Sequence, residues 1–144
     1  MAIGSRNDPY MNYNFLVEID GITAAGFQEC SGLESSTETV EYREGGENST
    51  SRKLPGRTTF GDIVLKRGIT DSEELWDWRK SVINGSIQRK SGSIILLDQE
   101  RNEARRWNFH SAWPSKWEGP SLDAKANDVA IETLTITHES LEIA

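Results

Sequence analysis

The amino-acid sequence predicts a single domain that is mainly β, with one α-helix. Two patterns support this prediction: apolar and polar side chains alternate in several segments, whereas one segment has apolar residues at helical spacing. The length of 144 residues suits one domain, residues 1–144. The alternation begins in residues 13–20, and Asp20-Gly21 then predicts a turn. One face of this first strand would carry Tyr13, Phe15, Val17 and Ile19.

Six later segments rich in β-branched and aromatic residues also predict strands, which gives six or seven strands in total. They are residues 27–33, 34–43, 60–67, 93–98, 105–117 and 129–139. The run Ile94–Leu97 predicts burial on both faces. Pro114 lacks an amide hydrogen, so it predicts an edge, a bulge or a break in its strand.

The helix is predicted over residues 71–84. Thr70 or Asp71 can cap its start, and Asn84-Gly85 supplies a left-handed stop. The stripe towards the core would consist of Leu75, Arg79, Val82 and Ile83, with Trp76 and Trp78 beside it.

Two polar segments have no strand or helix pattern. Residues 1–9 predict an N-terminal arm, and residues 44–57 predict a long Gly-rich loop. Loops of that length in a compact domain usually serve a function, so the second segment is a candidate contact arm.

The composition argues against several classes of protein. A net charge of −7 with scattered basic residues argues against nucleic-acid binding. A single cysteine, Cys30, excludes an intramolecular disulfide and suits a reducing cytoplasm. We expect no signal peptide and no membrane-spanning segment, because no apolar run is long enough.

The residues that could carry chemistry do not form a recognisable site. His110, His138 and Cys30 are more simply structural or exposed, so we expect no enzyme activity, metal or cofactor. Trp107, Trp113 and Trp117 share one parity, which predicts either a core and interface role or a row that stacks on a carbohydrate or other ligand. The threonine- and serine-rich strand faces suit either solvent or a polar lumen, and periodicity does not separate the two.

Several phrases, in order along almost the whole chain, resemble the contractile phage tail tube family. They are Pro9–Gly21, Gly26–Leu33, Tyr42–Gly46, Arg52–Gly56, Leu65–Thr70, Ala112–Pro120 and Val129–Leu134. The branch that the chain is most similar to is the inner tube protein of bacterial extracellular contractile injection systems.

The resemblance implies an antiparallel β-barrel or sandwich with one flanking helix, shared with the haemolysin-coregulated tube protein. It implies hexameric rings that stack into a hollow tube, which holds and delivers protein cargo. The implied partners are a sheath protein, baseplate or hub proteins and a tube cap, and the implied location is the bacterial cytoplasm during assembly and then a phage-tail-like particle. A paralogue that initiates or caps the tube is an alternative within the same class. No catalytic residues are implied.

The resemblance also implies roles for three groups of residues. The inter-subunit contact loop would use Glu44, Gly45, Gly46, Arg52, Lys53, Leu54, Pro55 and Arg57. The lumen would be lined by Ser35, Thr37, Thr39, Glu41, Thr133, Thr135 and Thr137. The helix would present Glu73, Asp77 and Lys80 to the sheath.

Overall fold

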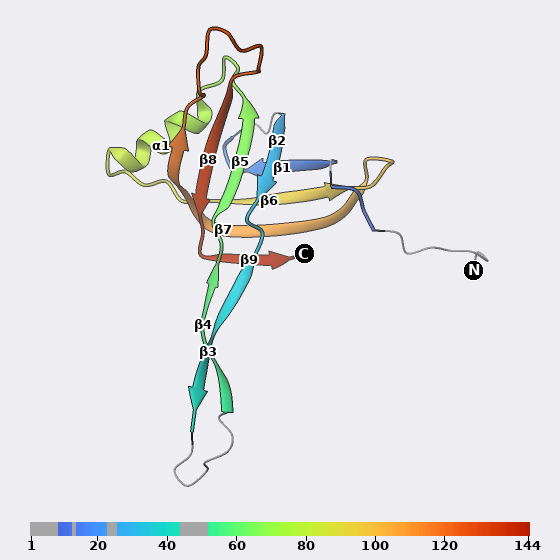
Figure 1. The fold of residues 1–144 in the computed structure, drawn as a ribbon, viewed down its shortest axis with the longest axis vertical. Coiled ribbons are helices and arrows are strands. Elements are labelled where there is room, and N and C mark those ends of the chain that lie inside the picture. Colours follow the sequence, from blue (N-terminus) through green and yellow to red (C-terminus); the bar gives the residue numbers. More distant parts are fainter. Residues whose placement is uncertain (1–8, 13, 23–25, 44–51) are drawn as a thin grey trace, which may run out of the picture.

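The computed structural model describes residues 9–12, 14–22, 26–43 and 52–144 (Figure 1). Tyr13 and residues 1–8 of the predicted arm lie outside this part of the chain. The first strands are β1 (Phe15–Ile19), β2 (Phe27–Ser31), β3 (Ser35–Tyr42), β4 (Arg52–Phe60) and β5 (Ile63–Gly68). They are followed by α1 (Glu74–Ile83), β6 (Lys90–Leu97), β7 (Glu103–Glu118), β8 (Ile131–Thr137) and β9 (Ser140–Ile143). The described part of the chain is thus mainly β with one helix, as predicted.

Seven of the described strands form one sheet that folds across itself. Its order is β1-β6-β7-β8-β5-β2, with β9 also paired to β7, and every pairing is antiparallel. In Figure 1, β1, β6 and β9 run across the view, whereas β8, β5 and β2 run along it. The molecule is therefore two crossed layers that share one long strand, an orthogonal sandwich.

The shared strand β7 changes layers near its middle. Trp107–His110 pair with β9, whereas Trp113–Glu118 pair with β8. Between them Ser111 adopts a φ of 54°, and the register with β8 shifts between Pro114 and Lys116. Pro114 therefore lies beside a bulge, one of the three outcomes that its missing amide hydrogen predicts.

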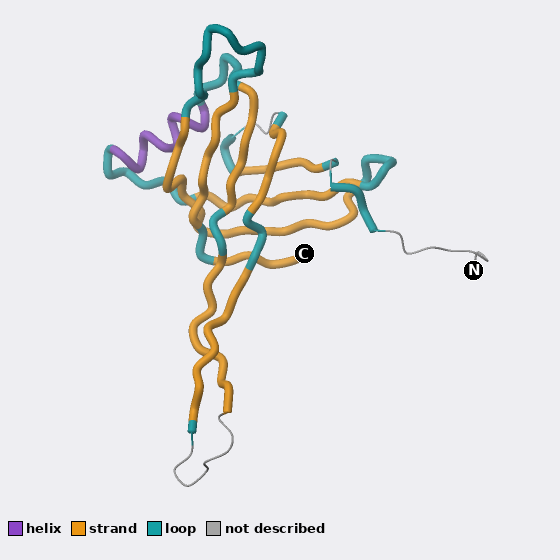
Figure 2. Tube along the Cα trace, viewed as in Figure 1, coloured by secondary structure: helices purple, strands orange, loops and turns teal. Residues whose placement is uncertain are grey.

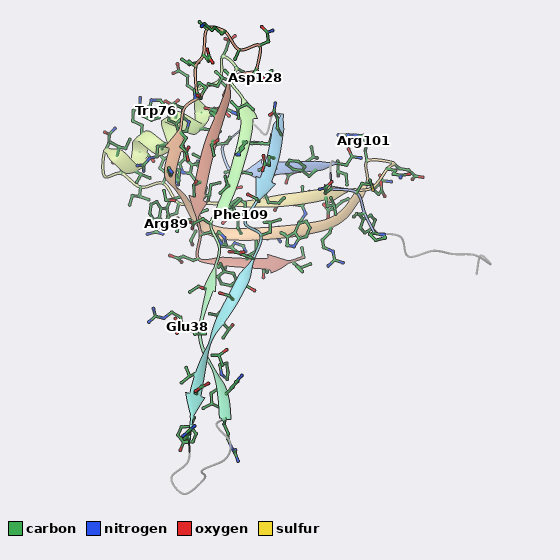
Figure 3. All side chains as sticks on the ribbon, in the orientation of Figure 1. Glu38, Trp76, Arg89, Arg101, Phe109 and Asp128 are labelled. Atoms are coloured by element: carbon green, nitrogen blue, oxygen red, sulfur yellow. The ribbon has the colours of Figure 1, made fainter. Side chains whose placement is uncertain are left out.

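The core lies between the two layers. Burial alternates along β5 and β8, so that Ile63, Leu65, Leu134 and Ile136 are fully buried and their neighbours point outward. From the crossing layer, Phe109 is also fully buried and closes the core (Figure 3). Burying side chains of this size stabilises the fold by about 1.5–3 kcal/mol each.

Helix α1 lies against β7 at one side of the sandwich (Figure 1). Leu75 and Trp78 are its buried residues, and the Trp78 indole Nε1 donates to the Gln88 carbonyl oxygen over 2.7 Å. The predicted stripe is thus wrong at two positions, because Trp78 belongs to it and Ile83 is exposed. The helix begins at Glu74, and its cap residue Glu73 makes no side-chain cap bond.

The end of the helix follows the prediction, whereas its start does not. Gly85 has a φ of 81°, and its amide donates to the Val82 carbonyl oxygen. The Thr70 hydroxyl accepts from the Ser72 amide instead of capping the helix, because residues 71–73 precede the first helical turn.

Strands β3 and β4 form a hairpin that projects away from the sandwich (Figure 2). The loop predicted over 44–57 is therefore wrong for its second part, because residues 52–57 belong to β4, which pairs with β3. Pro55 pairs with Thr39 and Thr58 pairs with Thr37, so β4 carries one extra residue at a bulge around Gly56. A two-stranded hairpin has only edge strands, and an edge strand with a bulge tolerates proline. Residues 44–51 lie outside the described part of the chain.

Candidate assembly surfaces

The hairpin carries an exposed apolar cluster on one face. Val40 pairs directly with Leu54, and Tyr42 lies two residues further along the same face of β3. These side chains are 47%, 46% and 48% exposed. An isolated two-stranded hairpin is only marginally stable in water, so a cluster of this kind favours a contact with another surface.

The predicted contact residues in 52–57 all lie on this hairpin and are exposed. They are Arg52, Lys53, Leu54, Pro55 and Arg57. The end of the hairpin carries charges of both signs, because Arg43, Arg52 and Lys53 lie beside Glu41, the direct partner of Lys53. The other predicted contact residues, Glu44, Gly45 and Gly46, lie outside the described part of the chain.

The seven residues predicted to line a lumen fall into two separate groups. Ser35, Thr37, Thr39 and Glu41 lie on the projecting hairpin, where the Thr37 and Thr58 hydroxyls are 2.9 Å apart. Thr133, Thr135 and Thr137 lie on β8 within the main sheet, on the side away from the core. The structure of one chain does not bring the two groups together.

The outer side of the layer formed by β2, β5, β8 and the end of β7 is a continuous polar surface, which we call the threonine face. Residues that are direct partners on neighbouring strands point to the same face, so this surface includes the partners of the three β8 threonines on β5 and β7. It also includes the outward residues of β2. It consists of Glu29, Ser31, Val64, Lys66, Trp113, Lys116, Glu118, Thr133, Thr135 and Thr137.

The charges on the threonine face are paired. Lys66 Nζ lies 3.7 Å from a Glu29 carboxylate oxygen, and Lys116 Nζ lies 3.1 Å from one of Glu118. The face is therefore polar yet locally neutral, so it generates no strong electrostatic field. The sequence prediction missed these four residues. The alternation of Lys66 with the apolar Leu65 in β5 does indicate that Lys66 points away from the core.

The outer side of α1 carries the predicted charged residues. Asp77 and Lys80 are exposed and 3.8 Å apart, and the exposed Glu73 immediately precedes the helix. Trp76, labelled in Figure 3, packs against Trp117, with ring centroids 5.0 Å apart and the ring planes tilted by 58°. This contact fixes the helix on the sandwich, and the charged side chains stay in solvent.

Two strand edges of the layer with the threonine face lack a partner among the described strands. They are the outer edge of β2 and the outer edge of the last part of β7. Because four successive antiparallel strands lie between these edges, β2 and the end of β7 run in opposite directions. Unpaired edges are templates for pairing with another chain.

The tryptophan row predicted for ligand stacking does not form. Trp107 and Trp117 pack against the core, whereas Trp113 pairs with Thr137 on the threonine face. At Ser111, which has a positive φ, and again at the bulge after Pro114, the side chains of β7 that pointed to one face of the sheet switch to the other. The spacing of the tryptophans in the sequence does not show these two switches.

The residues weighed for catalysis have structural surroundings. His110 Nε2 lies 3.0 Å from Glu142 Oε1, and its Nδ1 lies 3.5 Å from Ser91 Oγ. The order serine, histidine, carboxylate resembles a triad, but the His110 and Glu142 side chains are 46% and 64% exposed, so water competes for each bond. Burial raises the pKa of the Cys30 thiol to about 12, which makes it a poor nucleophile.

Two further searches of the described residues gave negative results. We found no cluster of three or more histidine, cysteine or acidic side chains that could hold a metal ion. In the same residues, α1 is too short and polar to span a bilayer.

Comparison with known proteins identifies the fold and the family. A search of curated proteins gave no match. A chain in the cryo-EM structure of the anti-feeding prophage baseplate, 6-fold symmetrised, is similar at 29% identity, with a TM-score of 0.87 over 96% of this chain and 97% of that one. A chain in the PVC sheath-tube complex of an extracellular contractile injection system, in the extended state, is 30% identical, with a TM-score of 0.86 over 96% and 93%.

A more distant structure shares the fold. Hcp1 from Flavobacterium johnsoniae is 19% identical, with a TM-score of 0.58 over 92% of this chain and 95% of that one. The family model described as T4-like virus tail tube protein gp19 matches residues 11–142. Almost the whole chain is covered, and it therefore belongs to the T4-like tail tube protein family.

Proposed function

We propose that copies of this chain form hexameric rings, that the rings stack into a hollow tube inside a sheath, and that the lumen holds protein cargo for delivery. The observation that carries the proposal is the pair of edges without a partner strand, among the described strands, on either side of the threonine face. The similarity to chains from a 6-fold symmetrised baseplate and from a sheath-tube complex supports the copy number and the sheath partner. Baseplate or hub proteins and a tube cap complete the set of proposed partners, in a particle that is assembled in the cytoplasm.

The ring would close by joining the β2 edge of one copy to the β7 edge of the next. The two edges run in opposite directions, so the junction is antiparallel like every pairing within the chain. A head-to-tail contact of this kind generates a ring if its rotation closes. The closed ring would leave neither edge exposed.

The threonine face would then line the lumen. It is polar, and its lysines are paired with glutamates, so unfolded or folded cargo of either charge would find few strong binding sites. The opposite side of the same layer is the core, so the lumen wall and the hydrophobic core are the two faces of one sheet.

Stacking would use the hairpin. It projects from one end of the molecule, whereas the loop 119–130, marked by Asp128 in Figure 3, lies at the other end. The hairpin end carries the exposed Val40, Tyr42 and Leu54, and the opposite end carries charged residues and two exposed apolar side chains. Those residues are Asp71, Asp123, Lys125 and Asp128, with Leu122 82% exposed and Val129 67% exposed. Head-to-tail stacking would bring the exposed apolar side chains of the two ends together.

The helix would face the sheath. α1 lies beside β7 and outside the layer that carries the threonine face (Figure 1), so Glu73, Asp77 and Lys80 would stay accessible after ring closure.

Electron microscopy tests the assembly. Negative-stain images of the purified chain, and of the chain co-expressed with its sheath and baseplate proteins, should show six-fold rings or tubes. Monomers under every one of these conditions would overturn the proposal.

Cross-linking tests the edge pairing. In a Cys30→Ala background, Glu29→Cys with Lys116→Cys places one thiol on β2 and one on β7. Oxidation should give covalent oligomers with a limit at six chains, because each edge meets its complement on the next copy. The control pairs Glu29→Cys with Asp77→Cys on the helix, which should remain uncrosslinked. Equal cross-linking of both pairs would contradict this mode of closure.

A further inference from the structure

The two layers of the sandwich do not end together at the β2 edge. In Figure 1, the layer of β1, β6 and β7 extends past β2, so part of its inner face lies beyond the strand that would cover it. Trp107 lies on that inner face, and its direct partner on β9, Ile143, is 59% exposed. The fold therefore leaves apolar side chains of one layer uncovered beside the edge of the other.

A groove of about 490 Å³ lies between β2 and this inner face, and we call it the β2 groove. The two layers and the residues after β2 contribute apolar side chains to its lining: Phe15, Cys30, Leu33, Ile94, Leu96 and Trp107. Ligand-sized grooves with an apolar lining are typical of surfaces that bind a partner.

Helix α1 has two exposed sides with different chemistry. Side chains three, four or seven positions apart share one side of a helix. The charged side carries the three residues proposed to face the sheath. The second side, which we call the β7 flank, lies roughly a quarter turn around the helix axis. It consists of Trp76, Arg79 and Ile83.

The β7 flank runs along the last part of β7. Trp76 packs against Trp117, and Arg79 Nη1 donates to the Pro114 carbonyl oxygen over 3.3 Å. These contacts leave Trp76 37% exposed, and Ile83, one turn further on, 57% exposed. The flank is therefore an apolar surface beside the outer edge of β7.

The β2 groove and the β7 flank lie on the same side of the layer that carries the threonine face. Cys30 in the groove is the direct partner of Leu65, which pairs with Leu134, which pairs with Trp117. This row points to the core, opposite the threonine face, and ends where Trp117 meets Trp76. The groove and the flank are thus the two ends of one side of the layer.

We infer that the β7 flank of one copy covers the β2 groove of the next copy, so that Trp76 and Ile83 pack against the apolar lining of the groove. The inference rests on the proposed function, in which the β7 edge of one copy joins the β2 edge of the next. That junction brings the flank to the groove, because the two surfaces adjoin the joined edges on the same side. The charged side of the helix points away from the groove and stays open to the sheath.

The short length of β2 gives the contact a reason. β2 has five residues, so its edge is about 17 Å long. Hydrogen bonds along so short an edge bury little apolar surface, whereas stable interfaces bury about 1,200–2,000 Å² around an apolar centre. The helix and the groove supply that centre.

Ile83→Asp tests the contact in solution. Under conditions in which the unmodified chain forms rings, sedimentation velocity gives the chain concentration at which half of the copies are assembled. This concentration should rise at least about tenfold, because each contact loses a buried apolar side chain. An unchanged concentration would overturn the inference.

Leu16→Asp is the matched control. Leu16 is 43% exposed and lies on β1 between Phe15 and the buried Val17, so it points to the outer face, away from the groove. This variant should assemble like the unmodified chain. Circular dichroism should show that both variants stay folded, since both side chains are exposed. Equal loss of assembly in the two variants would contradict a specific role for the flank.

Disulfide formation locates the contact. In a Cys30→Ala background, Leu33→Cys places a thiol in the groove and Ile83→Cys places one on the flank. Because β2 and α1 lie on opposite sides of one molecule (Figure 1), a disulfide joins different copies. Oxidation should give covalent oligomers with a limit at six chains. The control pairs Leu33→Cys with Asp77→Cys on the charged side, and equal yields from the two pairs would overturn the inference.

The edge pair, Glu29→Cys with Lys116→Cys, separates this inference from the proposed function. If the edge pair and the groove pair both give oligomers of up to six chains, both ideas are supported. If only the edge pair does so, the ring stands and the helix does not cover the groove. If neither pair does so, ring closure fails and the inference fails with it.

Discussion

Arg67 and Glu132 form an ion pair inside the sandwich, with the arginine Nε 2.6 Å from a glutamate oxygen. Their side chains are 3% and 8% exposed, and the residues are direct partners on β5 and β8. The other oxygen of Glu132 accepts from the Trp117 indole, and the Arg67 guanidinium lies over the Phe27 ring. The pair thus ties together β2, β5, β7 and β8, the four strands that carry the threonine face.

We predict that replacing one partner of this ion pair costs more stability than replacing both partners by apolar residues. Arg67→Met or Glu132→Leu alone should lower the free energy of unfolding by about 3–5 kcal/mol, because each leaves a buried charge without its partner. The double variant should cost less than the sum of the two. Urea denaturation of the three proteins measures the difference. Single variants that each cost under about 1 kcal/mol would show that the charges are solvated.

We predict that the threonine face tolerates substitution although it lies on a core sheet. Thr135→Val should change the free energy of unfolding by under about 0.5 kcal/mol, because the side chain points away from the core. Its neighbour supplies the control: Leu134→Ala, on the buried parity, should cost about 2–5 kcal/mol. Similar costs for the two variants in thermal or urea unfolding would mean that the assigned faces are wrong.

We predict that the left-handed residue at the corner of β7 responds to glycine and to valine in opposite ways. At a φ of 54°, Ser111→Gly should be neutral or stabilise by up to about 1 kcal/mol, because glycine adopts this conformation without strain. Ser111→Val should destabilise, since β-branched residues avoid positive φ. Melting temperatures measured side by side check the order. A valine variant as stable as the glycine variant would contradict the corner geometry.

We predict that Cys30 is unreactive in the folded chain. With its pKa raised to about 12 by burial, almost no thiolate exists at neutral pH, and thiol reagents attack the thiolate. Because the folded state holds this proton more tightly than the unfolded state, stability should also fall as pH rises above about 8.5.

The rate of reaction with a thiol-specific dye, with and without denaturant, measures the first effect. Cys30→Ala is the control for the second effect, since it removes the only cysteine and should abolish that part of the pH dependence. Rapid labelling of the folded chain would show that the thiol is accessible.

Much of the fold could be predicted because its signals are local. The alternation in β5 and β8 and the stop at Asn84-Gly85 depend on residues that are close in sequence, and the structure confirms them. The segment 52–57 was misassigned because Pro55 and Gly56 are turn residues by local propensity. Pairing with β3, a partner more than ten residues away, overrides that propensity.

The positions of side chains on the surfaces could be predicted only in part, for a similar reason. The face of Thr133, Thr135 and Thr137 follows from parity within one strand. The face on which each tryptophan lies depends on Ser111 and on the bulge after Pro114, because the side chains of β7 change faces at both places. Nothing in the residue pattern indicates both changes. The ion pairs of Lys66 and Lys116 depend on register between strands, which a single sequence does not specify.

The number of strands between the two free edges has a consequence for redesign. The layer has four strands, each antiparallel to the next, and because this number is even, β2 and the end of β7 run in opposite directions. Adding a single strand at either edge would turn the proposed junction from antiparallel to parallel and change its hydrogen-bond pattern. Adding a whole hairpin would preserve it. A wider bore should therefore be sought by inserting strands in pairs, and natural variants of the family that differ in bore are expected to do so by steps of two.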